Sequence, residues 1–316
     1  MSNSYSHSCM RIGLCSDTHY WPGGTNTLTP AGGLQLQQHS QQLQASLLSE
    51  LKAADVDLVI HLGDLTCGGG SFGMPREKFL QSLLETHAGF NSLPMPTYAL
   101  PGNHDCLPGG NDWALFEKLW QLDSGLGRTI DTPHARLILL NAQGHSVDQI
   151  DPTFPHDPVY GWINESEMAR LEADLASSDG RPIFVFIHQL LLPWTGTQPW
   201  KDFYGVKNAA AVRSILHSCR DVQAIFQGHA HRLNVQKIWQ NMSPFTYVVT
   251  PSIVEYPVSW LMLTVTSEML EVKMMPLPLP DLRSRSMNSG QGQHWRDGEP
   301  EWQSFTIPLL EMDLSY

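Results

Sequence analysis

The segment YALPGNHD, at residues 98–105, joins a short apolar run to a turn and then to side chains that bind metal ions or transfer protons. Residues 98–100 have the length and apolar content of a buried strand, and the Pro-Gly pair after them ends it. Asn103, His104 and Asp105 follow directly. Because ligands of α/β proteins bind beyond the carboxyl ends of the strands, the segment predicts a strand that delivers functional groups to a site.

Four other segments repeat this arrangement. In each, a short apolar run precedes residues that can bind metal. The runs and the residues that follow them are 12–15 with Asp17 and His19, 58–62 with Asp64, 183–187 with His188, and 224–226 with His229 and His231. Five such strand ends predict one site assembled from distant parts of the sequence.

Helical patterns occupy the stretches between these expected strands. They cover residues 34–54, 76–87, 113–122, 164–177 and 208–219. The alternation of strand and helix makes the predicted fold class α/β. Beyond residue 240, three expected strands at 245–249, 258–264 and 270–274 follow one another without a helix. We therefore expect an antiparallel part to close the sheet system.

The candidate ligands are imidazoles, carboxylates and one amide oxygen, a set that suits first-row transition metals. They are Asp17, His19, Asp64, Asn103, His188, His229 and His231. This number exceeds a single tetrahedral site and suits two ions that share a bridging ligand. Residues i and i+2 of an extended segment point the same way, so Asp17 with His19 should reach one crevice, and likewise His229 with His231. A glycine before Asp64, Asn103 and His229 should let the backbone approach closely.

Composition limits the classes of function. Of 316 residues, 41% are hydrophobic and 16% charged, which is enough for a substantial core and excludes a largely disordered chain. The net charge of -12 repels phosphate backbones, so we expect no extended nucleic-acid surface. The five cysteines form no CxxC pair, which fits a reducing compartment. With neither a signal peptide nor a membrane-spanning stretch expected, the predicted location is cytoplasmic.

The ordered blocks DxH, GD, GNHD, a lone His and GHxH resemble the calcineurin-like metallophosphoesterase family. They stand at residues 17–19, 63–64, 102–105, 188 and 228–231, within a resemblance that runs from about residue 12 to 274. The resemblance implies a two-sheet β-sandwich flanked by helices, a four-layer αββα fold. The short spacing looks most like the small bacterial branch that includes the class III cyclic-nucleotide phosphodiesterases.

The resemblance also implies how the ligands divide. One ion would be held by Asp17, His19 and His231 and the other by Asn103, His188 and His229, with Asp64 bridging both. Two adjacent cations lower the pKa of a shared water and neutralise charge on a phosphoryl group. The ligand types leave Mn, Fe, Zn and Co open as the metal, with Mn or Fe favoured.

His104 and Asp105 are the predicted catalytic residues. His104 directly follows the candidate ligand Asn103, so it should lie at the rim of the site as a proton donor to the leaving oxygen, or as a cation that stabilises the phosphoryl group. Asp105 is expected to orient and charge the imidazole of His104.

The expected activity is dinuclear metal-dependent hydrolysis of small phosphodiesters, with cyclic nucleotides leading. Phosphomonoesters and nucleoside pyrophosphates remain alternatives. So does a hypothesis of another class, a non-catalytic metal-binding scaffold of the same fold. Such a scaffold could lose His104 or several ligands, whereas this sequence retains every one of them.

Residues 1–275 form the predicted catalytic domain, and residues 276–316 form a C-terminal extension on or near it. The extension is rich in Pro, Ser, Arg and Gly through about residue 301, which predicts an extended segment, and residues 305–310 are expected to pack back.

Several other residues lie near the blocks or in loops between elements. Cys67 and Cys106 are interpreted as buried bystander thiols, Asn208 as a helix N-cap, residues 68–70 as a flexible loop, and Tyr20 and Trp21 as packing residues. His134, His145 and His156 are interpreted as surface residues. Trp194, Trp200, Phe203 and Tyr204 form a candidate specificity lid, for which a purely structural role stays open.

Overall fold

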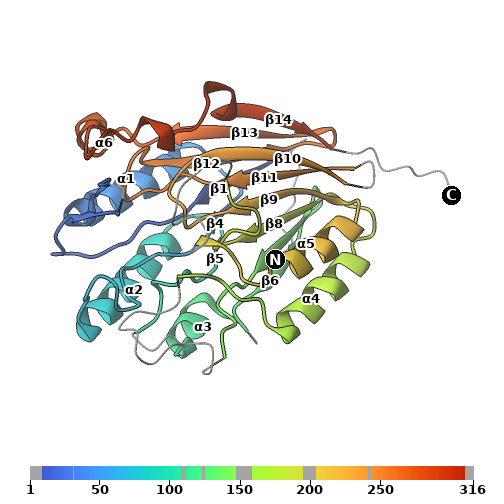
Figure 1. Ribbon diagram of the computed structural model, residues 1–316, viewed down its shortest axis with the longest axis horizontal. Coiled ribbons are helices and arrows are strands. Elements are labelled where there is room, and N and C mark those ends of the chain that lie inside the picture. Colours follow the sequence, from blue (N-terminus) through green and yellow to red (C-terminus); the bar gives the residue numbers. More distant parts are fainter. Residues whose placement is uncertain are drawn as a thin grey trace.

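The computed structural model describes residues 9–30, 32–107, 112–122, 125–146, 159–194, 204–240 and 243–309. Their centre is a pair of six-stranded sheets (Figure 1).

The first sheet combines the N-terminal strands with the C-terminal ones. Its members are β1 (Met10–Cys15), β4 (Leu58–His61), β5 (Thr97–Ala99), β12 (Ser259–Val265), β13 (Met269–Pro276) and β14 (Ser304–Pro308). They are arranged in the order β14-β13-β12-β1-β4-β5. β1, β4 and β5 run parallel to one another, whereas β12, β13 and β14 join by antiparallel pairing.

The second sheet is formed by the middle of the chain. Its members are β6 (Arg128–Asp131), β7 (Arg136–Leu140), β8 (Ile183–Ile187), β9 (Val222–Gln227), β10 (Asn234–Gln240) and β11 (Ser243–Val249). They are arranged in the order β10-β11-β9-β8-β7-β6. The four central strands are parallel, and β6 and β10 are antiparallel edge strands. A small hairpin, β2 (Thr27–Leu28) with β3 (Leu34–Gln35), stands apart from both sheets.

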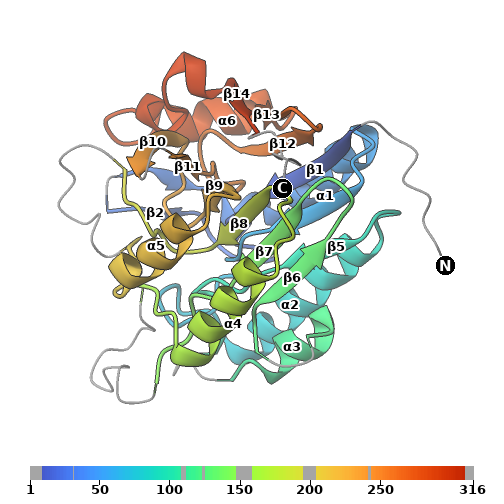
Figure 2. The same cartoon turned by 90° about the vertical axis from the view of Figure 1, so that its right-hand side faces the viewer.

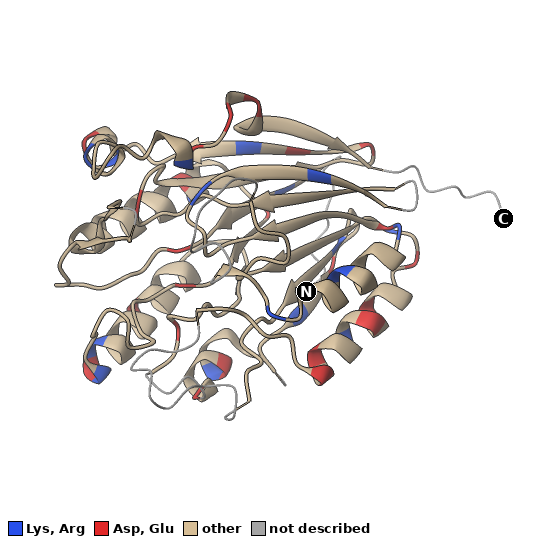
Figure 3. Cartoon of the chain, in the orientation of Figure 1, with Lys and Arg blue, Asp and Glu red and all other residues tan. Residues whose placement is uncertain are grey.

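The main core lies between the two sheets, because apolar side chains from both meet there. Leu14 and Ile60 of the first sheet join Phe186 and Phe226 of the second in one buried cluster. The rings of Phe186 and Phe226 are stacked with their centroids 5.3 Å apart. The central strands β8 and β9 contain no charged residue, and charged side chains lie mainly on outer helices and loops (Figure 3).

Helices cover the outer faces of both sheets. They are α1 (Ser40–Ala53), α2 (Arg76–Asn91), α3 (Ala114–Trp120), α4 (Glu165–Ala176), α5 (Ala209–Ser218) and α6 (Pro280–Met287). Side chains of α1, α2 and α3 form a second core with the first sheet, while α4 and α5 form a third with the second sheet. Figure 2 shows these two groups of helices on opposite sides of the strands. The predicted four-layer αββα fold is confirmed.

The antiparallel part expected after residue 240 is present in the first sheet, where β12 pairs antiparallel with β1 and β13, whereas β11 joins the second sheet in parallel with β9. Two other expectations about elements were wrong. The helix expected from residue 34 starts at Ser40, since residues 34–35 form β3. Residues 276–301 are not extended: they contain α6 and two 3-10 turns, His294–Arg296 and Pro300–Trp302. β14 then pairs with β13 at the sheet edge.

Two asparagines at helix starts behave differently. The side chain of Asn164 accepts a hydrogen bond from the backbone N of Glu167, so it caps α4. Asn208 precedes α5, but its side chain bonds to the backbone N and O of Ile163 instead. Asn208 thus holds the predicted N-cap position of α5 without a side-chain capping bond, and its side chain links α5 to the segment before α4.

Candidate metal centre

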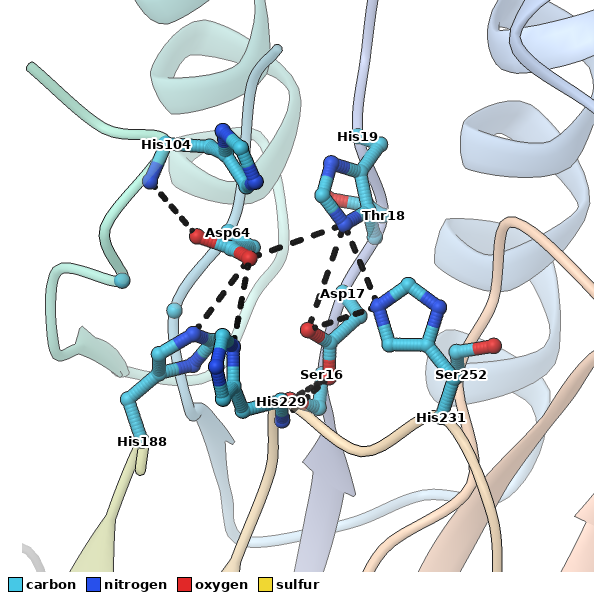
Figure 4. A network of polar contacts seen from close by, with 12 residues as sticks. Ser16, Asp17, Thr18, His19, Asp64, His104, His188, His229, His231 and Ser252 are labelled. Carbon is cyan, nitrogen blue, oxygen red and sulfur yellow. Dashed lines mark hydrogen bonds and ion pairs between the residues drawn. The ribbon is translucent and has the colours of Figure 1, made fainter. Parts of the chain in front are cut away.

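The carboxyl ends of five strands, from both sheets, meet at one place. Asp17 and His19 follow β1, Asp64 follows β4, and Asn103 follows β5. His188 follows β8, and His229 and His231 follow β9. All seven side chains are buried. Figure 4 shows six of them pointing toward a common centre, with His104 above Asp64.

Asp64 lies in the middle of this group. Its Oδ2 is 3.3 Å from Nε2 of His188, 3.6 Å from Nε2 of His19 and 4.0 Å from Nδ1 of His229. Its other oxygen, Oδ1, accepts a hydrogen bond of 2.8 Å from the backbone N of His104. A single carboxylate oxygen therefore faces imidazoles from both sheets.

Asp17 is the second carboxylate among the imidazoles of the two sheets. Its Oδ1 lies 3.1 Å from Nε2 of His231 and 4.0 Å from Nε2 of His19. Its Oδ2 accepts hydrogen bonds from the Ser16 hydroxyl and from the backbone N of His229. The two imidazole nitrogens of His19 and His231 face each other at 3.2 Å, a separation that needs a proton or a cation between their lone pairs.

These side chains form two overlapping groups suited to metal ions. Within each group the ligand atoms lie within 4.8 Å of one another, and the groups are Asp17, Asp64, His188 and His229, and Asp17, His19 and His231. Several of the buried atoms have no hydrogen-bond partner, namely Asp17 Oδ1, Asn103 Oδ1, His188 Nε2 and both ring nitrogens of His229. Buried polar atoms without partners are costly, so this donor set fits cations.

The electrostatics of the site favour the ligand forms of Asp64, His19 and His229. Burial raises the pKa of Asp64, but the imidazoles of His188, His104 and His19 outweigh it and hold the pKa well below its usual range. Burial lowers the pKa of His19 to about 3 and that of His229 well below its usual range. An ionised carboxylate and neutral imidazoles are the forms that bind metal. At His188 and His231 the neighbouring carboxylates outweigh burial, which raises the pKa of His188 and raises that of His231 to about 10.

The backbone at the site is unusual. Positive φ angles occur at Asp17 (55°), His19 (42°), Asp64 (55°), His229 (65°) and His231 (50°). Left-handed backbone costs free energy in residues other than glycine, and it gathers at functional sites. The expectation that Asp17 and His19 converge as alternate residues of an extended strand was therefore wrong, because left-handed turns bring them together.

Glycines at the site allow two strand ends to touch. A Cβ on Gly102 would lie 2.1 Å from Oδ1 of Asp64, and a Cβ on Gly63 would lie 2.5 Å from the backbone N of Gly102. No side chain fits at either position. The predicted close approach before Asp64 and Asn103 is confirmed.

His104 and Asp105 lie beside the metal-ligating groups in different ways. Nδ1 of His104 is 3.0 Å from the carbonyl O of Gly68. The carboxylate of Asp105 accepts hydrogen bonds from the backbone N of Gly102, Leu65 and Thr66. The prediction that Asp105 orients the imidazole was wrong. Asp105 instead ties the loop after β4 to the loop after β5, and the Gly68 carbonyl contacts the ring.

A pocket of about 540 Å³ opens over the site, and its walls include His19, Asp64, His104, His229 and His231. Two aromatic rings also line it. Phe72 lies with its ring centroid 4.8 Å from that of His104, and Tyr204 lies 4.9 Å from His229.

The candidate lid falls partly within the described residues. Trp194 is buried with its ring centroid 5.5 Å from that of Tyr204, which lines the pocket. Trp200 and Phe203 lie outside the described residues, as does His156.

Three residues near the sequence blocks, Cys67, Cys106 and Tyr20, are buried. Cys67 and Cys106 are buried free thiols that contact the carbonyl oxygens of His19 and Asn103. Tyr20 is buried, and its hydroxyl donates to Glu85.

Residues 68–70 lie in a loop, as predicted, and Gly68 N and Gly69 N donate to the carbonyls of His104 and Cys106. One interpretation of a loop residue was wrong. His145 is half-buried against Tyr160 and not at the surface.

Two functional candidates escaped the sequence reasoning. Nδ1 of His231 lies 2.5 Å from Oε1 of Glu255, and the guanidinium of Arg296 lies 3.2 Å from Oε2 of the same carboxylate. One signal existed in the sequence, since Glu255 interrupts the apolar run SIVEYPV at residues 252–258. A buried acid in such a run requires a partner.

Comparison with known proteins gives the family. The family model for calcineurin-like phosphoesterases matches residues 10–233. The chain therefore belongs to the calcineurin-like phosphoesterase family, and this membership classes it as a hydrolase.

Relatives and a solved structure agree with this membership. A probable cyclic nucleotide phosphodiesterase of Vesicomyosocius okutanii is 26% identical over 59% of this chain and 67% of its own length. The 3′,5′-cyclic adenosine monophosphate phosphodiesterase CpdA of Escherichia coli is 27% identical over 56% of this chain and 55% of its own length. The crystal structure of a dimetal phosphatase from Danio rerio superposes with a TM-score of 0.68 at 15% identity, covering 95% of this chain and 99% of that one, which shows the shared fold. Among the described residues, no helix is both long and apolar enough to cross a membrane.

Proposed function

We propose that this protein is a dinuclear metal-dependent phosphodiesterase. The observation that carries the proposal is the placement of Asp64, whose Oδ2 lies 3.3 Å from a histidine of one ligand group and 3.6 Å from a histidine of the other. In the proposed arrangement Asp17, His19 and His231 would hold one ion, Asn103, His188 and His229 would hold the other, and Asp64 would be shared by both.

The chain fixes the ligand atoms before any ion arrives. Nδ1 of His188 donates to the carbonyl O of Leu62, 2.9 Å away, which leaves Nε2 to face Asp64. Outer hydrogen bonds of this kind set the tautomer and the orientation of a metal-binding imidazole. Two neighbouring cations, when bound, lower the pKa of water toward neutrality and offset negative charge on a phosphoryl group.

His104 is the proposed proton donor to the leaving oxygen. The carbonyl of Gly68 only accepts hydrogen bonds, so Nδ1 of His104 carries a hydrogen. The proton given to the leaving oxygen is then a second one, carried on Nε2, and the donating ring is an imidazolium that becomes neutral as the proton leaves. His104 lines the pocket beside His19 and Asp64, which supports this role. Asp105 is retained as a residue that positions the loop bearing Asn103 and His104, through its bonds to backbone N atoms.

Small phosphodiesters are the proposed substrates, with cyclic nucleotides first. Two relatives carry the names of cyclic nucleotide phosphodiesterases, and the pocket has aromatic rings at Phe72 and Tyr204 beside the ligand groups. Phosphomonoesters and nucleoside pyrophosphates are the alternative substrates. A hydrolysis panel of cyclic nucleotides, mononucleotides, dinucleotides and sugar phosphates, run with Mn and with Fe, separates these classes. Cyclic nucleotides turned over no faster than the other substrates would overturn the proposed order.

A non-catalytic scaffold is the rival of another class. The test is hydrolysis of bis-p-nitrophenyl phosphate with added Mn, compared with the Asp64→Asn variant, because this substrate does not depend on a proton donor. Turnover no higher than that of the variant would favour the scaffold.

We also propose a reducing, cytoplasmic location, which the free cysteines support. Residues 1–275 form the proposed catalytic domain, and the extension at 276–316 belongs to its working structure, as the following contacts indicate.

A further inference from the structure

The C-terminal extension reaches the candidate metal centre through one arginine. Arg296 closes the 3-10 turn His294–Arg296. Its Nη2 lies 3.2 Å from Oε2 of Glu255, and its Nη1 donates to the carbonyl O of His231 at 3.0 Å. Its Nε donates to Oε1 of Gln293 at 2.9 Å. Each of the three guanidinium nitrogens thus lies within 3.2 Å of an acceptor oxygen.

Glu255 joins this arginine to the proposed ligand His231. Oε1 of Glu255 lies 2.5 Å from Nδ1 of His231, so the carboxylate accepts the Nδ1 hydrogen and turns Nε2 toward the site. Nε2 is the atom that lies 3.1 Å from Asp17. Arg296 therefore fixes His231 twice, once through its backbone carbonyl and once through the carboxylate that holds its ring.

This arrangement is fully buried. Glu255 is 1% exposed and Arg296 is 4% exposed. Charges taken out of water are costly unless each is paired and hydrogen-bonded, and breaking such a pair leaves an uncompensated charge. A buried ion pair often contributes little net stability, so stability alone does not explain why Glu255 and Arg296 are paired here. Their contact with the proposed ligand His231 offers a functional explanation.

Further contacts hold the turn that carries Arg296. The guanidinium of Arg232 lies over the rings of both Trp194 and Trp295, at 5.1 and 4.8 Å from their centroids. The hydroxyl of Tyr256 donates to Asp297 at 2.6 Å. The residue after the candidate ligand His231 is thus held between two tryptophans, one of which comes from the extension.

We propose that Glu255 and Arg296 are positioning residues for the ion held by Asp17, His19 and His231, which makes the C-terminal extension an obligatory part of the metal centre. This inference rests on the proposed function. It adds residues beyond positions 10–233, the part of the chain that the family model matches. Partners that orient a metal-binding histidine typically contribute about 10- to 100-fold to metal affinity.

The test is a titration of the metal-free full-length protein with Mn²⁺, followed by the electron paramagnetic resonance signal of free Mn²⁺. Reference variants His231→Gln and His188→Gln assign the two binding constants to the two ligand groups. Glu255→Gln keeps the shape of the side chain and removes its charge, and Arg296→Met removes the guanidinium. We expect each to weaken the constant that His231→Gln abolishes, by about 10- to 100-fold, and to leave the other within about threefold.

Two controls separate positioning from general damage. Arg285→Met removes an exposed arginine of α6 in the same extension and should leave both constants unchanged. Arg296→Lys keeps the positive charge but loses the planar guanidinium with its several donors. Its Mn²⁺ binding constant at the affected site should lie between those of wild type and Arg296→Met. Two ions bound by wild type and unchanged constants in Glu255→Gln and Arg296→Met would overturn this inference alone. Fewer than two ions bound by wild type would overturn the proposed function and this inference with it.

A measurement on the wild-type protein decides the matter if the variants do not fold. Nitrogen-15 spectra of histidine-labelled, Zn²⁺-loaded protein report which ring nitrogen of His231 carries hydrogen. A protonated Nδ1 is expected, because Glu255 accepts from it. A bare Nδ1 would overturn the inference.

Discussion

Replacement of His104 by alanine separates proton donation from metal binding. The contact between His104 and the proposed bridging residue Asp64 is made by the backbone N, at 2.8 Å, so it survives the substitution. Within the described part of the chain, the ring contacts the Gly68 carbonyl, at 3.0 Å, and neighbouring rings at the half-buried rim of the pocket. His104→Ala should therefore keep both ions and stay within about 1 kcal/mol of the wild-type unfolding free energy.

The catalytic loss should depend on the leaving group. A positioned general acid contributes about 10²- to 10⁴-fold, which corresponds to about 3–5.5 kcal/mol of transition-state free energy. We expect kcat for cyclic AMP, with its alkoxide leaving group, to fall by about this factor. For p-nitrophenyl esters the leaving group departs without a proton, so the fall should be less than about tenfold.

The assay compares kcat of wild type and His104→Ala across aryl methyl phosphodiesters, from p-nitrophenol to unsubstituted phenol as leaving groups. His134→Ala, which removes a half-buried histidine in the turn between β6 and β7, is the matched control and should equal wild type. A uniform loss over the series would assign His104 to charge stabilisation and refute proton donation. A loss of bound metal would refute the claim that its side chain lies outside the ligand set.

Four further predictions test the site and the core. Asp64→Asn should reduce bound metal from two equivalents to at most one and lower kcat about 100-fold or more; two retained equivalents by elemental analysis would contradict bridging. Chelation of wild type should lower Tm by about 5–10 °C in scanning fluorimetry, because ligands at 100 times Kd contribute about 2.7 kcal/mol; an unchanged Tm would argue against bound ions. Gly102→Ala should cost about 1–3 kcal/mol or more and lose metal, whereas Gly125→Ala, with no atom within 4 Å of the new Cβ, should keep both ions. Phe226→Ala removes a fully buried ring stacked on Phe186 and should lower the unfolding free energy by about 3–5 kcal/mol in urea, and a change below about 1 kcal/mol would contradict its core role.

The strands that carry ligands were the predictable part of the fold. β8 was expected at residues 183–187 and spans Ile183–Ile187, because a run of five apolar residues ending in His188 has few other interpretations. β7, Arg136–Leu140, was missed although it is equally buried. Its end offers no metal ligand, so the pattern that found the other strands did not apply to it.

The relations between side chains were the unpredictable part of the site. Glu255 and Arg296 lie 24 and 65 residues from His231 in the sequence. Neither residue belongs to the ordered blocks that identified the candidate ligands, and it is the return of the extension to the first sheet that brings Arg296 to His231. Asp105 shows the same limit: its neighbour His104 was the natural partner by sequence, but the turn directs its carboxylate to backbone N atoms across the loop.

The left-handed residues explain why the site needs both sheets. Such backbone persists only where its surroundings over-determine it. The loop after β1 is held by the loop after β4, since the backbone N of Asp17 donates to the carbonyl of Gly63 and that of His19 to the carbonyl of Asp64, each at 3.0 Å. From the second sheet, the backbone N of His229 donates to Asp17 at 3.0 Å. Each loop thus fixes the next, so backbone contacts alone arrange the candidate ligand atoms, and we expect ions to add stability without building the site.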